Sequence, residues 1–170
     1  MNYSIVYSSM TGNTALLAQS LKEHLSAQGC DYFGSAQRAP SPLLSPRIFV
    51  GFWTDKGTCD AHTRTLLQAL HGKQILLFGT AGFGQAEQYF TQILDRVRQE
   101  IPADNQVLGG YMCQGKMPLT VRQRYEQLLQ EDPGNQRLQM LLANFDQALP
   151  HPNQQDLRGL YQWLQTLDLD

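Results

Sequence analysis

The chain has 170 residues, of which 42 % are hydrophobic and 16 % are charged, and its formal net charge at neutral pH is −2. This length suits one domain with a sizeable core, and the hydrophobic fraction argues against a disordered chain. A slightly acidic chain without a cluster of lysines and arginines lacks the basic face that nucleic-acid binding usually requires. We therefore expect a single domain over residues 1–170 that binds no nucleic acid.

Metal binding, secretion and membrane insertion are also disfavoured. The three cysteines, Cys30, Cys59 and Cys113, are widely spaced, and no two of the four histidines are spaced as metal ligands. Neither arrangement suits a disulfide framework or a metal site. No basic segment precedes the first apolar run, and no apolar run approaches the roughly 20 residues that span a bilayer. We expect a cytoplasmic protein without a metal ion or a membrane segment.

The first predicted elements are a strand over 3–7, a polar turn, and a helix that carries Leu16, Leu17, Leu21 and Leu25 on one face. The first N–H groups of such a helix have no partners within it and attract anions. The turn adds hydroxyl groups and a glycine that lets the backbone approach an anion. We therefore predict a phosphate site without charged side chains, made of Ser9, Met10, Thr11, Gly12, Asn13 and Thr14.

Two common nucleotide-binding motifs do not match this turn. A Walker loop requires Gly-x-x-x-x-Gly-Lys-Ser/Thr, and a dinucleotide fingerprint requires Gly-x-Gly-x-x-Gly after the first strand; the chain has neither. An ordinary capped helix remains an alternative, because serine, threonine and asparagine are favoured N-cap residues.

Short apolar runs and helical stripes alternate up to residue 113. Further strands are predicted over 30–33, 47–52, 74–79 and 106–113, and helices are predicted before the fourth and fifth strands. Residues 34–46 contain three prolines and are predicted to be irregular. Such alternation indicates an α/β fold with a parallel sheet and helices on both faces.

The segment Tyr7–Thr14 resembles the phosphate loop of the flavodoxins, whose pattern is Ser/Thr-x-Thr-Gly-x-Thr, and the wider resemblance covers residues 3–113. It implies FMN as the cofactor, with its phosphate against Ser9–Thr14. It also selects one of two strand orders that periodicity leaves open. The predicted fold is a flavodoxin-like doubly wound five-stranded parallel sheet, order 2-1-3-4-5, with an extra C-terminal helical segment.

Ligands of such sheets bind beyond the carboxyl ends of the strands. After the third strand, Trp53 or Phe52 stands where flavodoxins contact the flavin ring, although a tryptophan there can also fill the core. The resemblance implies that the Gly57 peptide turns over when the flavin is reduced, which glycine tolerates. Lys56 departs from the acidic surroundings of flavodoxins and would favour an anionic reduced flavin. The predicted contacts in this loop are Phe52, Trp53, Thr54, Asp55, Lys56 and Gly57.

The loop after the fourth strand is rich in small residues, whose backbone N–H groups would meet the pyrimidine edge of the flavin. Phe83 resembles the aromatic residue that covers the outer ring face in many flavodoxins. A flexible glycine-rich turn is the alternative. The predicted contacts are Thr80, Ala81, Gly82, Phe83 and Gly84.

The core is predicted over about residues 1–113 and a helical extension over about 114–170, with three apolar stripes broken near 132–134 and 150–152. A flavodoxin needs one helix here, so the excess lies over the flavin edge, forms a partner or dimer surface, or extends the core. The extension, with 51–58 and 113–118, resembles flavodoxin-like proteins encoded beside bilirubin reductases in gut anaerobes. This implies a bilin reductase as partner, with Cys113 and Lys116 on the partner surface. The alternative is that Cys113 is simply buried and Lys116 simply solvated.

The leading prediction is an FMN-binding electron carrier that serves a partner oxidoreductase and has no catalytic residues of its own, because the flavin supplies the chemistry. The alternative is an FMN-dependent NAD(P)H:quinone-type reductase on the same fold. The modest net charge keeps this alternative open, since dedicated carriers are often more acidic. A binding protein that has lost its flavin is a third hypothesis, which the intact phosphate loop disfavours. The sequence leaves the oligomeric state open.

Overall fold

The computed structural model describes residues 1–84 and 86–169. In these residues the central sheet has parallel strands in the order β2-β1-β3-β5-β6. A short strand, β4, pairs antiparallel with the end of β3 and lies off this path. Counting the parallel strands alone, the order is the predicted 2-1-3-4-5, so the predicted fold class is confirmed. The strands are β1 (Tyr3–Tyr7), β2 (Cys30–Ser35), β3 (Arg47–Asp55), β4 (Thr58–Cys59), β5 (Gln74–Ala81) and β6 (Gln106–Gln114).

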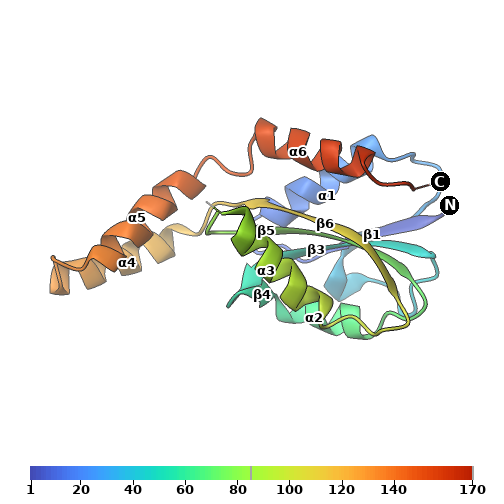
Figure 1. The fold of residues 1–170 in the computed structure, drawn as a ribbon, viewed down its shortest axis with the longest axis horizontal. Coiled ribbons are helices and arrows are strands. Elements are labelled where there is room, and N and C mark those ends of the chain that lie inside the picture. The colour runs from blue at the N-terminus through green and yellow to red at the C-terminus, as the bar shows by residue number, and fades with distance from the viewer. Residues whose placement is uncertain (85, 170) are drawn as a thin grey trace.

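Helices cover both faces of the sheet (Figure 1). α1 (Asn13–His24) and α6 (Gln154–Gln165) pack side by side on one face, and α2 (Ala61–Gln68) and α3 (Glu87–Arg98) lie on the other. The proline-rich segment after β2 holds one short 3₁₀ helix, η1 (Ala36–Arg38), and is otherwise without helix, as predicted.

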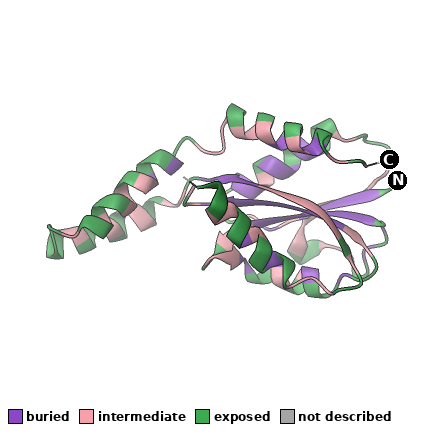
Figure 2. Ribbon diagram, in the orientation of Figure 1, coloured by how far each residue is buried: buried purple, intermediate pink, exposed green. Residues whose placement is uncertain are grey.

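The core has two layers because alternate residues of a strand point to opposite faces of the sheet. On β3, Ile48, Val50 and Phe52 pack into the layer under α2 and α3, whereas Phe49 packs into the layer under α1 and α6. Both faces of this strand are buried, which explains its continuous apolar sequence. Figure 2 shows the same burial along the middle of the sheet.

Two phenylalanine–glycine pairs lock β3 to β5. In the register of these strands Gly51 lies opposite Phe78, and Phe52 lies opposite Gly79. A Cβ atom on Gly51 would lie 2.4 Å from the Phe78 ring, and one on Gly79 would lie 2.4 Å from the Phe52 ring. Each ring therefore occupies the space that the facing glycine leaves free, one pair on each face of the sheet.

The remaining helices, α4 (Leu119–Glu131) and α5 (Gln136–Ala148), form a hairpin that projects from the carboxyl end of the sheet (Figure 1). In these two helices Phe145 and Ala148, near the base of α5, are the buried residues. The hairpin therefore does not extend the core, and α6 is the helix that completes the cover of the sheet. A partner or dimer surface and a cover over the flavin edge remain as roles for the hairpin.

We predict that Gly79→Ala lowers the free energy of unfolding by about 1–3 kcal/mol, because the added methyl group must displace the buried Phe52 ring. Urea unfolding of the two proteins measures the difference. Gly134→Ala is the matched control, since a Cβ atom there meets nothing within 4 Å. Equal losses for the two variants would show that the phenylalanine–glycine pairing is not tightly packed.

Candidate functional site

A small cavity of about 140 Å³ lies at the carboxyl ends of β1, β3 and β5. The predicted phosphate loop, the end of β3 and the loop after β5 all contribute to it, as does the segment after β6. The topology explains this meeting, because parallel strands present their carboxyl ends at one edge of the sheet. The lining residues are Met10, Thr11, Asn13, Trp53, Thr54, Thr80, Ala81, Gly82, Gly115, Lys116, Met117, Pro118 and Val121.

The N-terminus of α1 is open to a ligand. Its N-cap residue, Gly12, has a φ of 88° and no side chain to cap the helix, and the first turn holds no acidic residue. A Cβ atom on Gly12 would meet nothing within 4 Å, so the space above the glycine is free. The Ser9 hydroxyl accepts a hydrogen bond from the Ala15 N–H at 3.3 Å. The remaining N–H groups and the helix dipole suit an anion such as a phosphate.

Thr14 ties this loop to the sheet. Its side chain is fully buried, and its hydroxyl donates to the Phe52 carbonyl at 3.1 Å and lies 3.2 Å from the Thr80 hydroxyl. A bond from this hydroxyl to a phosphate stays a prediction, because its proton points to β3 in the cofactor-free chain. Thr14 holds the start of α1 against the ends of β3 and β5.

Asn13 joins the phosphate loop to the segment after β6. Its side-chain N–H₂ donates to the Lys116 carbonyl at 2.8 Å, and a Cβ atom on Gly115 would lie 2.4 Å from that nitrogen. The Asn13 side-chain oxygen is buried and has no hydrogen-bond partner among the described residues. A buried acceptor of this kind normally has a partner. Asn13 is also one of the residues that line the cavity.

Phe52 and Trp53, the two predicted aromatic contacts on β3, point in different directions. The Phe52 ring is fully buried against Gly79 and does not line the cavity, and its contact with a cofactor stays a prediction. Trp53, the next residue, is half-buried and lines the cavity. Its neighbour Thr54 donates a side-chain hydrogen bond to the Thr80 carbonyl at 2.8 Å, which ties the end of β3 to β5.

The predicted residues Asp55, Lys56 and Gly57 do not line this cavity. Asp55 pairs with Thr58 across a tight turn in which Lys56 has a φ of 50° and Gly57 a φ of 81°. The Gly57 carbonyl accepts a hydrogen bond at 3.1 Å from the Arg96 guanidinium of α3. The cation at the cavity is instead Lys116, which is exposed.

Phe83 and Gly84 line a second cavity, of about 600 Å³, between the loop after β5 and α5. The hairpin is anchored to this loop at Gly82, whose carbonyl accepts hydrogen bonds from the side chains of Gln114, at 2.9 Å, and Asn144, at 3.1 Å. A Cβ atom on Gly82 would lie 2.6 Å from the Met117 sulfur. The loop after β5 therefore connects the small cavity to the base of the hairpin.

The site was only partly predicted. Gly115, Met117, Pro118 and Val121 were not among the predicted contacts. The signal that could have found them is topological, since they follow the last parallel strand and must emerge at the same edge as the other loops.

Cys59 and Cys113 are buried, and neither is among the residues that line the small cavity. Burial raises the pKa of the Cys113 thiol far above the usual range. Burial likewise raises the pKa of Cys59 to about 11. Both thiols therefore stay protonated near neutral pH. The described residues contain no group of three or more histidine, cysteine or acidic side chains that could hold a metal ion, and no helix among them could cross a bilayer.

The open N-terminus of α1 lies beside a cavity lined by Trp53, at the switch point of a doubly wound sheet. Flavodoxins have this sheet order and bind FMN at that place. Comparison with known proteins agrees. The family model described as a flavodoxin domain matches residues 4–165. The chain belongs to this family, and its cofactor is FMN.

Two curated relatives are named "Flavodoxin-like domain-containing protein BilS". The one from Clostridium symbiosum (strain WAL-14163) is 36 % identical over 180 residues, covering 96 % of this chain and 94 % of the relative. The one from Clostridioides difficile (strain CD3) is 30 % identical over 169 residues, covering 92 % and 90 %. Among solved structures, oxidised Flavodoxin 2 from Bacillus cereus shares the fold with a TM-score of 0.55 at 16 % identity, covering 96 % of this chain and 94 % of that chain.

We predict that Thr14→Val lowers the free energy of unfolding of the cofactor-free chain by about 1–3 kcal/mol, because it leaves buried hydrogen-bonding groups of β3 and β5 without their partner. Chemical denaturation checks this. Thr65→Val is the control, because the Thr65 hydroxyl is exposed and bonds only within α2. An effect of Thr14→Val no larger than that of Thr65→Val would contradict the role assigned to Thr14.

Proposed function

We propose that this FMN-binding electron-transfer flavoprotein is a carrier that delivers electrons to a partner oxidoreductase, for which a bilin reductase is the candidate. The observation that carries the proposal is the open N-terminus of α1 at Gly12, next to a cavity lined by Trp53 and Asn13. An anion site beside an aromatic surface matches the phosphate and the ring of FMN.

The residues present suit this cofactor. The backbone of Ser9–Thr14 and the hydroxyls of Ser9 and Thr11 would bind the phosphate, and Trp53 would contact the ring. The backbone of Thr80–Gly82 would meet the polar edge of the ring. At about 140 Å³ the cavity is smaller than the roughly 300–1,000 Å³ of most ligand pockets, so FMN would extend beyond it. Contacts from residues 55–57, 83 and 84 remain predictions.

Once bound, FMN supplies the redox chemistry, and the chain sets its surroundings. Among the described residues that line the cavity, Lys116 is the one with a titratable side chain. Its positive charge would favour a negatively charged reduced flavin and so raise the reduction potential. A site with no acid or base beyond this lysine suits electron transfer better than substrate chemistry.

The choice of partner rests on the relatives and on the subgroup resemblance. Two relatives that match over nearly their whole length carry the name BilS. The resemblance of the helical extension to flavodoxin-like proteins encoded beside bilirubin reductases supports a bilin reductase as the electron acceptor. The predicted cytoplasmic location is compatible with this role and stays a prediction.

The test is a stopped-flow measurement on the FMN-loaded chain. The chain is reduced anaerobically, freed of reductant and mixed with purified, oxidised bilin reductase from the same organism. We expect the flavin of the carrier to be reoxidised as the reductase is reduced. We also expect negligible turnover when the chain alone is given NAD(P)H and a soluble quinone.

Either of two results would contradict the proposal. Rapid NAD(P)H and quinone turnover by the chain alone would favour the reductase alternative. Failure of the reduced carrier to pass electrons to the reductase would remove this enzyme as its partner.

A further inference from the structure

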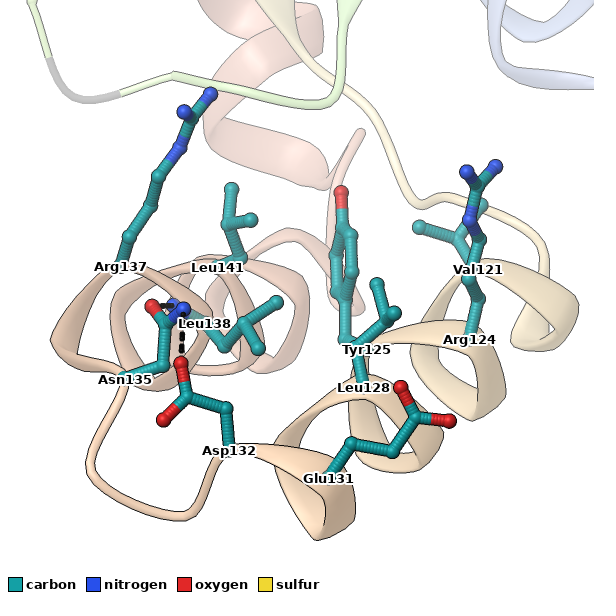
Figure 3. A pocket seen from close by; sticks show the side chains of 10 residues that line it. All are labelled: Val121, Arg124, Tyr125, Leu128, Glu131, Asp132, Asn135, Arg137, Leu138 and Leu141. Atoms are coloured by element: carbon teal, nitrogen blue, oxygen red, sulfur yellow. Dashed lines mark hydrogen bonds between the residues drawn. The ribbon is translucent and has the colours of Figure 1, made fainter.

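The α4–α5 hairpin carries an open groove of about 630 Å³ between its two helices (Figure 3). The floor of this groove, which we call the hairpin groove, is apolar, and two arginines and a tyrosine rise beside it. The floor is made of Val121, Leu128, Leu138 and Leu141, and the polar side chains that line the groove are Arg124, Tyr125, Glu131, Asp132, Asn135 and Arg137. Glu131 and Asp132 lie at the turn between the two helices, at the other end from the two guanidinium groups (Figure 3), and Asp132 accepts a hydrogen bond from the Asn135 side chain.

Large apolar side chains are exposed on this hairpin, which projects away from the core. Leu128 is 40 % exposed in the hairpin groove, and Met140 of α5 is 72 % exposed. Figure 2 shows that most of the hairpin surface is exposed or half-buried. Exposed apolar side chains that gather within a polar rim are typical of a protein–protein interaction site.

The arginines of the hairpin divide into two kinds. Arg122 joins the two helices, because its guanidinium bonds to the Asp146 carboxylate of α5 at 3.1 and 3.2 Å and also pairs with Glu126. The hydrogen bond to Asp146 raises the pKa of Arg122 above its ordinary value. By contrast, Arg124 and Arg137 are exposed and form no hydrogen bond or ion pair with any residue in the described part of the chain.

Arg124 and Arg137 stand on opposite sides of the apolar floor. Figure 3 shows both guanidinium groups and the Tyr125 hydroxyl pointing the same way, out of the hairpin. Arginine and tyrosine around an apolar centre are the residue types that protein interfaces favour. The complementary surface is an apolar helix flanked by carboxylates, which would fill the groove and pair with both arginines.

The hairpin groove is continuous with the cofactor site. Val121 lines both the groove and the small cavity beside Trp53. On the other side, Arg137 and Leu141 are shared with the cavity that contains Phe83. A protein that docks in the hairpin groove would therefore lie next to the cofactor cavity.

We propose that the hairpin groove is the docking surface for the partner oxidoreductase, which presents to it an apolar helix flanked by acidic side chains. This inference rests on the proposed carrier function. The arginines speed and orient the encounter, and the apolar floor holds the complex once it has formed. The redox partner is the favoured occupant because the groove adjoins the site from which the electrons leave.

The test compares the FMN-loaded chain with a double variant, Arg124→Glu with Arg137→Glu, in the stopped-flow assay described above. Both side chains are exposed, so the variant should fold and keep its flavin. At low ionic strength we expect its electron transfer to the reductase to be about tenfold slower or more, because the attraction becomes repulsion. The wild-type rate should fall as salt is added, whereas the rate of the variant should not.

The control double variant is Lys22→Glu with Arg98→Glu, which changes the net charge by the same amount in the last turns of α1 and α3, away from the cavity. It should keep the wild-type rate with the reductase. All three proteins, once reduced, should pass electrons to a small uncharged quinone, which needs no docking surface and feels no net charge, at equal rates.

The outcomes separate the two proposals. If the wild-type carrier does not reduce the reductase at all, the proposed function fails and the docking surface fails with it. If the wild-type carrier transfers electrons but the groove and control variants behave alike, the docking surface alone is overturned. Light scattering adds a third outcome, because a wild-type dimer that the groove variant dissociates would assign the groove to a second copy of this chain.

Discussion

The buried hydroxyl of Thr14 is the contact on which the arrangement of the site depends. It bonds to the Phe52 carbonyl on β3 and to the Thr80 hydroxyl on β5, and so joins the start of α1 to the ends of two strands. The neighbouring Asn13 extends this connection to Lys116 after β6. Two adjacent residues at one helix N-terminus therefore hold together all the loops that line the cavity. Both residues bond through neutral side-chain groups, so no carboxylate occupies the N-terminus of α1, and an anion can bind there.

The sheet provides a rigid base for these loops. The paired rings and glycines of β3 and β5 allow the two central strands to hold large aromatic side chains on both faces. With α1 and α6 covering one face and α2 and α3 the other, the core is complete without α4 and α5. The hairpin is consequently free to serve at the surface, and its anchor at the Gly82 carbonyl places it beside the cofactor cavity.

The sequence predicted the alternation of strands and helices from local patterns, and the strand order from the resemblance of one motif to the flavodoxins; both are confirmed. It was less successful where strand length decides the outcome. β3 continues to Asp55 rather than ending near residue 52. Phe52 therefore lies within the strand and points into the core, while Trp53 lines the cavity. Leu16, predicted on the buried face of α1, is 41 % exposed, whereas Leu17, Ala18 and Leu21 are buried in the core under this helix.

Long-range contacts could not be predicted in this way. Lys56 was expected to be the cation near the flavin, but the turn places it away from the cavity that Lys116 lines. The contact between Asn13 and Lys116 joins residues that are 103 positions apart, and no periodicity reveals such a pair. The hairpin was predicted as two helical stripes, but only the tertiary structure shows that they face each other and leave two arginines without a partner.

The central claim is that FMN binds at the carboxyl ends of β1, β3 and β5. The most direct measurement is a titration of the ¹⁵N-labelled, cofactor-free chain with FMN, followed by the backbone amide signals. The account predicts that the large shifts fall on residues 9–14, on Trp53 and Thr54, on 80–82 and on 115–117, and that the amides of α2 do not move. Large shifts centred on the hairpin groove, with none in 9–14, would contradict it.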